Sequence, residues 1–293
     1  MESSASVAPS NEEAVEAWNG PLFDRFLAFR DLVTTGLGAH GERALALHPP
    51  SRGDRVLDVG CGFGDTAQRL AGLVGPDGQV VGIDAAERFI EVARREAEQA
   101  GATNTSFLVG DVQVTEFGEP FDYAFSRFGT MFFANPVAAL RNVRLALAPG
   151  GRLCSVVWRR KLDNDWLHRA EVVVSGFLER NEDSDEPTCG PGPFSMADAD
   201  TTSAIVQAAG FEHVSLTRSD IDIKIGDDVD GAMALVMALG PAGELIRLAG
   251  AEGERVRPQI EAALREALSE FDGPRGVYAP ASTWIVSARA PSV

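Results

Sequence analysis

The chain has 293 residues, which is enough for one large domain or for a domain with an appendage. Its hydrophobic content of 45% is ordinary for a globular protein, and no apolar run is long enough to span a bilayer. The net charge of −17 argues against nucleic acid and anionic membranes as partners, because both are polyanions. We therefore expect a small-molecule partner.

The chain has three cysteines, Cys61, Cys154 and Cys189, which share no metal-ligand spacing. Residues 1–10 lack the basic and apolar regions of a signal peptide. These features predict reduced thiols, no metal site and a cytoplasmic location.

Residues 1–10 have the composition of a disordered tail, and short helical patterns lie on both sides of the turn sequence Trp18-Asn19-Gly20-Pro21. A third apolar stretch, around residues 44–47, ends at two prolines. These helices precede any strand pattern, so we expect residues 1–50 to pack onto the domain that follows and to close its ligand site.

A short apolar run then ends at three glycines on alternate positions, Gly60, Gly62 and Gly64, and an amphipathic helical pattern begins directly afterwards. This order predicts a buried strand, a tight turn and a helix N-terminus. Glycine lets a ligand approach the bare backbone, and the first N–H groups of the helix point at that ligand. The stretch therefore predicts a cofactor-binding turn.

Strand and helix patterns alternate from residue 55 to residue 158. The later strands of this part are expected at 79–83, 105–109, 121–125 and 153–158, with a helix opened by Asn135-Pro136. Regular alternation predicts an α/β fold, a Rossmann-like doubly wound sheet with helices on both faces, whose cofactor-binding core is residues 51–158. Ligands of such sheets bind at the carboxyl ends of the strands. Polar residues lie at or next to these ends: Asp58, Asp84, Asp111 and Ser126.

Beyond Trp158 the alternation stops. We expect the mostly helical segments 159–197 and 227–276 to form a cap over the strand ends. Strand patterns at 214–216, 221–225 and 283–288 predict that residues 159–293 also hold the rest of the sheet. Trp158 and Trp166 are expected to be core or cap residues.

The residue at the start of the helix after the glycines helps to identify the cofactor. Dinucleotide sites carry G-x-G-x-x-G/A, and counting from Gly60 the last of these places is held by Asp65. A carboxylate there would repel a pyrophosphate and would favour a ligand with positive charge. S-adenosylmethionine carries a sulfonium and an ammonium group and no phosphate. Asp84 suits its ribose diol, which donates two hydrogen bonds to one carboxylate.

Several motifs together resemble the class I S-adenosylmethionine-dependent methyltransferases. Asp58-x-Gly60-x-Gly62-x-Gly64 matches the first motif of this family, Asp84 its ribose acid and Gly110-Asp111-Val112 its adenine-binding turn. The run 121–133 and Trp18-Asn19-Gly20 resemble bacterial small-molecule members related to the ubiquinone and menaquinone biosynthesis methyltransferases. The resemblance covers roughly residues 17–158. It implies a seven-stranded sheet whose last strand is antiparallel, and a position for Trp18 over the methionine end of the cofactor.

The glycine turn and the resemblance together predict the residues that bind the cofactor: Trp18, Asp58, Gly60, Cys61, Gly62, Asp84, Ala85, Asp111, Val112, Ser126 and Arg127. Whether Asp58 contacts the ligand or only caps the N–H groups of the turn stays open. No catalytic base stands out, and His168 on the expected cap is only a candidate.

The implied function is in-line transfer of the methyl group of S-adenosylmethionine to a small, apolar or aromatic O, N or C acceptor. Two alternatives stay open, a protein that binds the cofactor without catalysis and a nicotinamide-dependent oxidoreductase. The sequence is compatible with a monomer or a homodimer.

Overall fold

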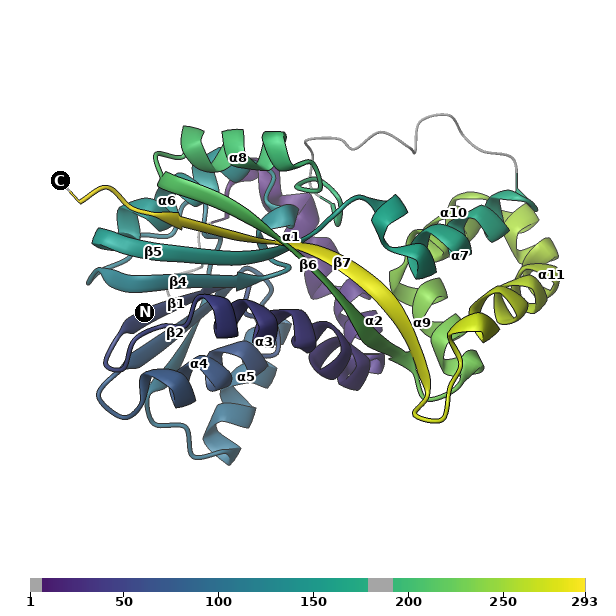
Figure 1. The fold of residues 1–293 in the computed structure, drawn as a ribbon, viewed down its shortest axis with the longest axis horizontal. Coiled ribbons are helices and arrows are strands. Elements are labelled where there is room, and N and C mark those ends of the chain that lie inside the picture. The colour runs from purple at the N-terminus through teal and green to yellow at the C-terminus, as the bar shows by residue number, and fades with distance from the viewer. Residues whose placement is uncertain (1–6, 179–191, 293) are drawn as a thin grey trace.

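The computed structural model describes residues 7–178 and 192–292, and the structural statements below concern those residues. Its centre is a seven-stranded sheet in the order β3-β2-β1-β4-β5-β7-β6 (Figure 1). The strands are β1 (Arg55–Val59), β2 (Gln79–Asp84), β3 (Thr105–Val109), β4 (Phe121–Arg127), β5 (Leu147–Trp158), β6 (Glu212–Gly226) and β7 (Val277–Arg289).

The first five strands form the parallel part of the sheet. β1 lies between β2 and β4, and β5 continues the parallel arrangement beyond β4. β7 is antiparallel to both β5 and β6, between which it lies. The predicted fold, a doubly wound seven-stranded sheet with an antiparallel last strand, is confirmed.

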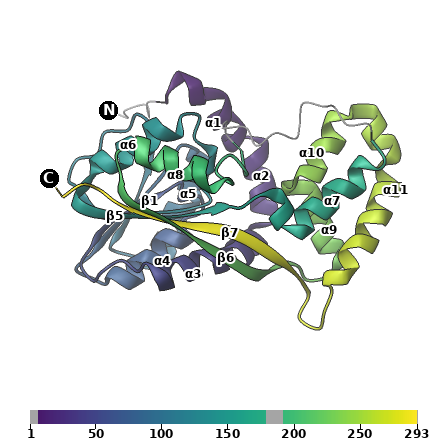
Figure 2. The same ribbon diagram turned by 45° about the horizontal axis from the view of Figure 1, so that its top comes forward.

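Helices cover both faces of the sheet, as strands with two apolar faces require. On one face lie α3 (Gly38–Leu47), α4 (Asp65–Val74) and α5 (Glu87–Gln99), and on the other lie α6 (Pro136–Ala146) and α8 (Ala199–Ala208) (Figures 1 and 2). Successive residues of a strand pack alternately against the two helix layers: Val56 packs in the cluster of α4 and α5, and Leu57 packs in the cluster of α6. The predicted N-cap of α6 is present, since Asn135 Oδ1 accepts a hydrogen bond of 3.0 Å from the Ala138 N–H.

The last two strands are longer than the sequence predicts. The patterns at 214–216 and 221–225 belong to one continuous strand, β6, and β7 begins at Val277 instead of at residue 283. The polar residues between the two predicted strands interrupt the alternating pattern. One of them, Asp220, accepts hydrogen bonds from Ser282 and Arg159, which lie elsewhere in the sequence. Both strands twist away from the rest of the sheet and lead to a second group of helices (Figure 1).

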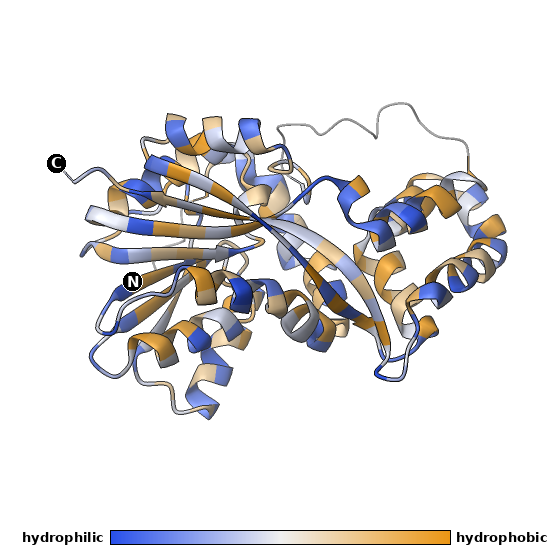
Figure 3. Cartoon of the chain, viewed as in Figure 1, coloured by the Kyte–Doolittle hydropathy of each residue, from blue (hydrophilic) through white to orange (hydrophobic). Residues whose placement is uncertain are grey.

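This second group consists of α7 (Asp165–Ser175), α9 (Val229–Leu239), α10 (Pro241–Leu248) and α11 (Gly250–Leu268). They come from the two segments for which the sequence predicts a cap, and they bury Val174, Val236 and Ile260 among themselves. Hydrophobic stretches run along the strands and along these helices (Figure 3). In the described part of the chain no single helix has the length and composition to cross a membrane. The pair α9 and α10 has them only jointly, with a bend of 62° between the two helices.

The N-terminal helices lie between the sheet layers and this helical group (Figure 2). They are α1 (Glu12–Asn19) and α2 (Pro21–Ala28), and a π-helical segment at Leu32–Leu37 connects them to α3. Helix α1 contacts α5, and α2 contacts α9. The N-terminal segment thus bridges the two parts at the carboxyl ends of the strands.

Candidate functional site

The glycine turn after β1 requires glycine for conformational and for steric reasons. Gly60, Gly62 and Gly64 have φ angles of 68°, 52° and 80°, in the left-handed region that other residues rarely adopt. A Cβ on Gly60 would lie 3.0 Å from Cα of Gly129, and one on Gly64 would lie 2.8 Å from Cβ of Ala93. The turn is therefore a bare stretch of backbone pressed between its neighbours.

Asp84, at the end of β2, holds this turn in place. Its Oδ2 accepts a hydrogen bond of 3.0 Å from the Gly62 N–H, and its Oδ1 accepts one of 3.0 Å from the Ala86 N–H. Desolvation raises the pKa of Asp84, and these backbone hydrogen bonds oppose the rise. A carboxylate offers about four lone-pair positions, so Asp84 retains acceptor capacity for the hydroxyls of a ligand.

Asp58, near the end of β1, has a buried oxygen atom without a hydrogen-bond partner. It is 1% exposed, and its Oδ2 is buried with no hydrogen bond. Burial raises the pKa of Asp58 to about 8, against the opposing effect of the Arg127 charge. If Asp58 capped the turn, it would accept a hydrogen bond from the Gly62 N–H, but that N–H donates to Asp84. An unpartnered buried carboxylate at a cavity wall is suited to a cationic ligand.

Asp65 differs from the expectation drawn from the sequence. It forms an ion pair of 2.8 Å with Nη2 of Arg127, the last residue of β4. Its charge is therefore compensated within the protein, and the premise that Asp65 presents an unpaired charge to a ligand is wrong. The acid at the cavity wall whose oxygen lacks a hydrogen-bond partner is Asp58.

Asp111, after β3, is also buried and already has several partners. Its Oδ2 accepts hydrogen bonds from the Ala8 N–H at 3.0 Å and from Nε2 of Gln113 at 3.1 Å. Its Oδ1 accepts one of 2.9 Å from the Gln113 N–H. The N-terminal segment thus reaches the turn that the sequence assigns to adenine.

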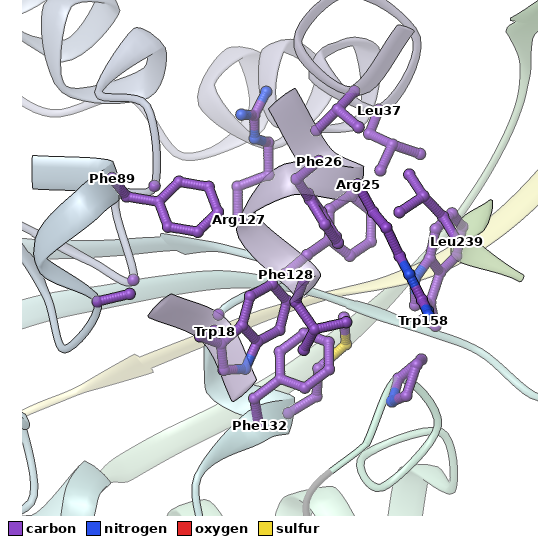
Figure 4. A pocket seen from close by; sticks show the side chains of 18 of the residues that line it. Trp18, Arg25, Phe26, Leu37, Phe89, Arg127, Phe128, Phe132, Trp158 and Leu239 are labelled. Atoms are coloured by element: carbon purple, nitrogen blue, oxygen red, sulfur yellow. The ribbon is translucent and has the colours of Figure 1, made fainter. Parts of the chain in front are cut away.

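Trp18 lines the same cavity as Asp111 and belongs to a cluster of aromatic rings. Its ring meets the rings of Phe26, Phe89 and Phe132 edge-on, with centroid distances of 5.2, 6.2 and 5.0 Å. Figure 4 shows Trp18 beside Phe132, with both side chains at the pocket. Its neighbouring turn is anchored as well, because the Arg88 guanidinium donates to the Asn19 carbonyl oxygen. Trp18 therefore roofs the cavity as part of an aromatic cluster.

A cavity of about 590 Å³ joins these groups. Of the predicted binding residues, those that line it are Trp18, Asp58, Gly60, Cys61, Gly62, Asp84, Ala85, Asp111, Val112 and Arg127. Ser126 is fully buried, and its hydroxyl donates to the Val59 carbonyl oxygen at 2.7 Å, so it does not line the cavity. His168 lies on α7 but is not part of the cavity wall either.

The far end of the cavity is aromatic and contains residues that the sequence did not single out for a ligand. Phe128 has a φ of 60° and stacks on Trp158 with a centroid distance of 4.5 Å. Trp166 and an ion pair between Lys161 and Glu171 complete this end. A strained φ and a pairing across ten positions leave no local signal in a sequence. The side chains of Phe128 and Trp158 are drawn in Figure 4.

The fold and the site define a Rossmann-like protein with a cofactor site at the strand ends. Residues 50–183 match the family Methyltransf_31, described as "Methyltransferase domain". The chain is 34% identical over 170 residues to the ubiquinone biosynthesis O-methyltransferase of Cereibacter sphaeroides, covering 54% of this chain and 68% of that protein. It is 38% identical over 114 residues to the aklanonic acid methyltransferase DauC of Streptomyces sp., covering 39% and 52%. The chain belongs to the class I S-adenosylmethionine-dependent methyltransferases, and S-adenosylmethionine is its cofactor.

Solved structures support the fold alone. The [4+2]-cyclase SpnF is 19% identical with a TM-score of 0.58, and the match covers 99% of this chain and 100% of that chain. The phosphoethanolamine N-methyltransferase 2 of Haemonchus contortus in complex with S-adenosyl-L-methionine is 16% identical with a TM-score of 0.56, covering 98% and 61%. The chain spans about half the length of two of the curated relatives that it matches, 51% of one ubiquinone biosynthesis O-methyltransferase and 52% of DauC.

Proposed function

We propose that this protein transfers the methyl group of S-adenosylmethionine to a small, apolar or aromatic acceptor. One observation carries the proposal: the unpartnered, buried Oδ2 of Asp58 lies at the wall of a cavity that continues into an aromatic chamber. A cation-binding acid and an apolar acceptor space in one cavity are what such a transfer requires.

The residues at the strand ends fit the cofactor. Asp58 would face the positively charged methionine end, and Asp84 would accept hydrogen bonds from the ribose hydroxyls. Val112 and the remaining acceptor capacity of Asp111 would serve adenine. The glycine turn would let the ligand approach Gly60 and Gly62 without a clash.

The bound cofactor supplies both the methyl group and the leaving group, so the protein has to position the acceptor and exclude water. Trp18 and the N-terminal helices would close one side of the cavity, and α7, α9 and α10 would close the other. We accordingly assign cofactor closure to residues 1–50 and cofactor binding to 51–158. Residues 159–293 would complete the sheet and add the cap through the described parts of 159–197 and 227–276; residues 179–191 of the expected cap lie outside the described part of the chain.

The Cereibacter sphaeroides relative is an O-methyltransferase by name, which supports an oxygen acceptor first and nitrogen or carbon second. The net charge of −17 supports a small-molecule substrate and no nucleic acid partner. We also propose a cytoplasmic location. The rival is a protein that binds the cofactor without catalysis.

Calorimetry with S-adenosylhomocysteine, S-adenosylmethionine and NAD tests the cofactor site, and transfer of an isotopically labelled methyl group to a panel of phenols tests the reaction. We expect the first two ligands to bind, NAD not to bind, and label to appear in a phenol. NAD binding without S-adenosylhomocysteine binding would overturn the proposal. Binding of S-adenosylhomocysteine with no label in any acceptor would favour the non-catalytic rival.

A further inference from the structure

The aromatic end of the cavity contains an ion pair with a buried carboxylate that the cofactor does not explain. Nζ of Lys161 lies 2.8 Å from Oε1 and 2.7 Å from Oε2 of Glu171, and Glu171 is only 5% exposed. Both side chains line the cavity. Removing the Glu171 carboxylate from water costs free energy that the attraction to a partly exposed Lys161 commonly does not repay, so stability alone is a poor reason for its burial.

Helix α7, which carries Glu171, also carries a buried polar group without a hydrogen-bond partner. Trp166 is 5% exposed and lines the cavity, and its Nε1 is buried without a hydrogen bond. Nearly all buried polar groups in folded proteins are hydrogen-bonded, and an indole N–H can only donate. The same helix therefore offers one unused donor, on Trp166, and one carboxylate with spare acceptor positions, on Glu171.

The spacing of these two residues on α7 separates the two groups. Five positions along a helix correspond to about 7.5 Å of rise, so one small polar group of a ligand would not serve both. A ligand with an acceptor atom and a donor atom on different edges of one rigid framework would serve both.

The wall beside them is aromatic. The rings of Phe128 and Trp158 are stacked at 4.5 Å and 28°, and Trp166 meets Trp158 edge-on at 6.5 Å. Phe128 holds a φ of 60°, a strained conformation for a bulky residue and one that is common at ligand sites. It also directly precedes Gly129, which touches Gly60 of the glycine turn, so this wall begins where the cofactor site ends.

We infer that this chamber recognises a planar, fused-ring aromatic acceptor that carries a hydroxyl group on one edge and a carbonyl group on another. The hydroxyl donates to Glu171, the carbonyl oxygen accepts from Trp166, and the rings lie against Phe128 and Trp158. Lys161 orients the Glu171 carboxylate through their ion pair. The inference rests on the proposed function and names its acceptor class.

Binding of three probes to the protein saturated with S-adenosylhomocysteine tests this assignment, with ligand-detected NMR or calorimetry as the readout. The probes are 6-acetyl-2-naphthol, its methyl ether, which cannot donate, and 2-naphthol, which lacks the carbonyl. In the unmodified protein the first should bind most tightly. Glu171→Gln should weaken 6-acetyl-2-naphthol roughly tenfold and leave the ether unchanged, because the ether makes no hydrogen bond to Glu171. Trp166→Phe should weaken 6-acetyl-2-naphthol and the ether, and leave 2-naphthol within about twofold.

The matched control is Asp165→Asn on the same helix. Asp165 forms an ion pair with Arg169, and neither residue lines the cavity, so its loss should change no probe affinity. S-adenosylhomocysteine affinity reports whether each variant is folded and whether the proposed function itself stands. If that ligand binds but the three probes bind equally or not at all, the acceptor assignment is overturned. The same conclusion follows if both substitutions weaken all probes alike.

Discussion

The raised pKa of Asp58 makes a prediction about cofactor binding that can be worked out in numbers. Burial raises this pKa to about 8, so the carboxyl group of the free protein is mostly neutral at pH 6 and half ionised at pH 8. If the ionised form is the one that binds the cation, the affinity for S-adenosylmethionine follows the ionised fraction. That fraction rises from about 1% to about 50%, so the affinity should rise roughly 50-fold between pH 6 and pH 8.

The same pKa fixes the sign of a stability effect in the free protein. In the unfolded chain the carboxyl group titrates near 3.8, so between about pH 4 and pH 8 the folded state binds more protons than the unfolded state. Stability of the free protein should therefore fall as the pH rises through this window, and Asp58→Asn should remove that part of the fall. Urea unfolding at several pH values measures it.

Calorimetry at pH 6, 7 and 8 on the unmodified protein and on Asp58→Asn provides the direct test of the affinity. The variant controls for titration of the ligand, because any slope that it retains does not come from Asp58. We expect a steep slope in the unmodified protein and a shallow one in the variant. Equal slopes would refute the argument that Asp58 meets the cationic end of the cofactor.

Three further predictions follow from the site. Asp84→Ala should weaken S-adenosylhomocysteine binding by about 1.5–3 kcal/mol, the range for hydrogen bonds to a charged group, and unchanged affinity in calorimetry would mean that Asp84 does not hold the ribose. Gly64→Ala should lower the midpoint of urea unfolding, because its Cβ would lie 2.8 Å from that of Ala93 at a φ of 80°. Deletion of residues 1–20 removes Trp18 and should leave a folded protein with clearly weaker affinity for S-adenosylmethionine and little turnover; full affinity would make the segment mere scaffolding.

The fold was predictable because its signals are local. Apolar runs that end at glycine or proline mark the parallel strands, and a capping residue such as Asn135 marks a helix start. The continuity of β6 was not predictable, because the polar stretch that interrupts its alternation is stabilised by Arg159 and Ser282, which are distant in the sequence. A pattern within one strand carries no information about partners that come from other elements.

The site divides in the same way. The strand-end acids could be found because parallel strands bring their carboxyl ends to one edge. The ion pair of Asp65 with Arg127 joins residues 62 positions apart, and the Ala8 contact of Asp111 spans 103 positions. Neither leaves a local signal. The choice of S-adenosylmethionine therefore stands on the motifs and the family, and the charge argument moves from Asp65 to Asp58.

The two ends of the cavity come from different parts of the chain. Substitutions at one end should therefore affect cofactor binding, and substitutions at the other end should affect acceptor binding. Asp58, Asp84 and Asp111 belong to strand ends of the parallel sheet, whose register is fixed by both buried faces. Trp166 and Glu171 belong to α7, which packs mainly on α10 and α11 and meets the cofactor core where Trp166 contacts Trp158 at the end of β5. Altering the polar residues of α7 should therefore change which acceptor binds while the affinity for S-adenosylhomocysteine stays the same. Altering the strand-end acids should weaken cofactor binding whichever acceptor is used.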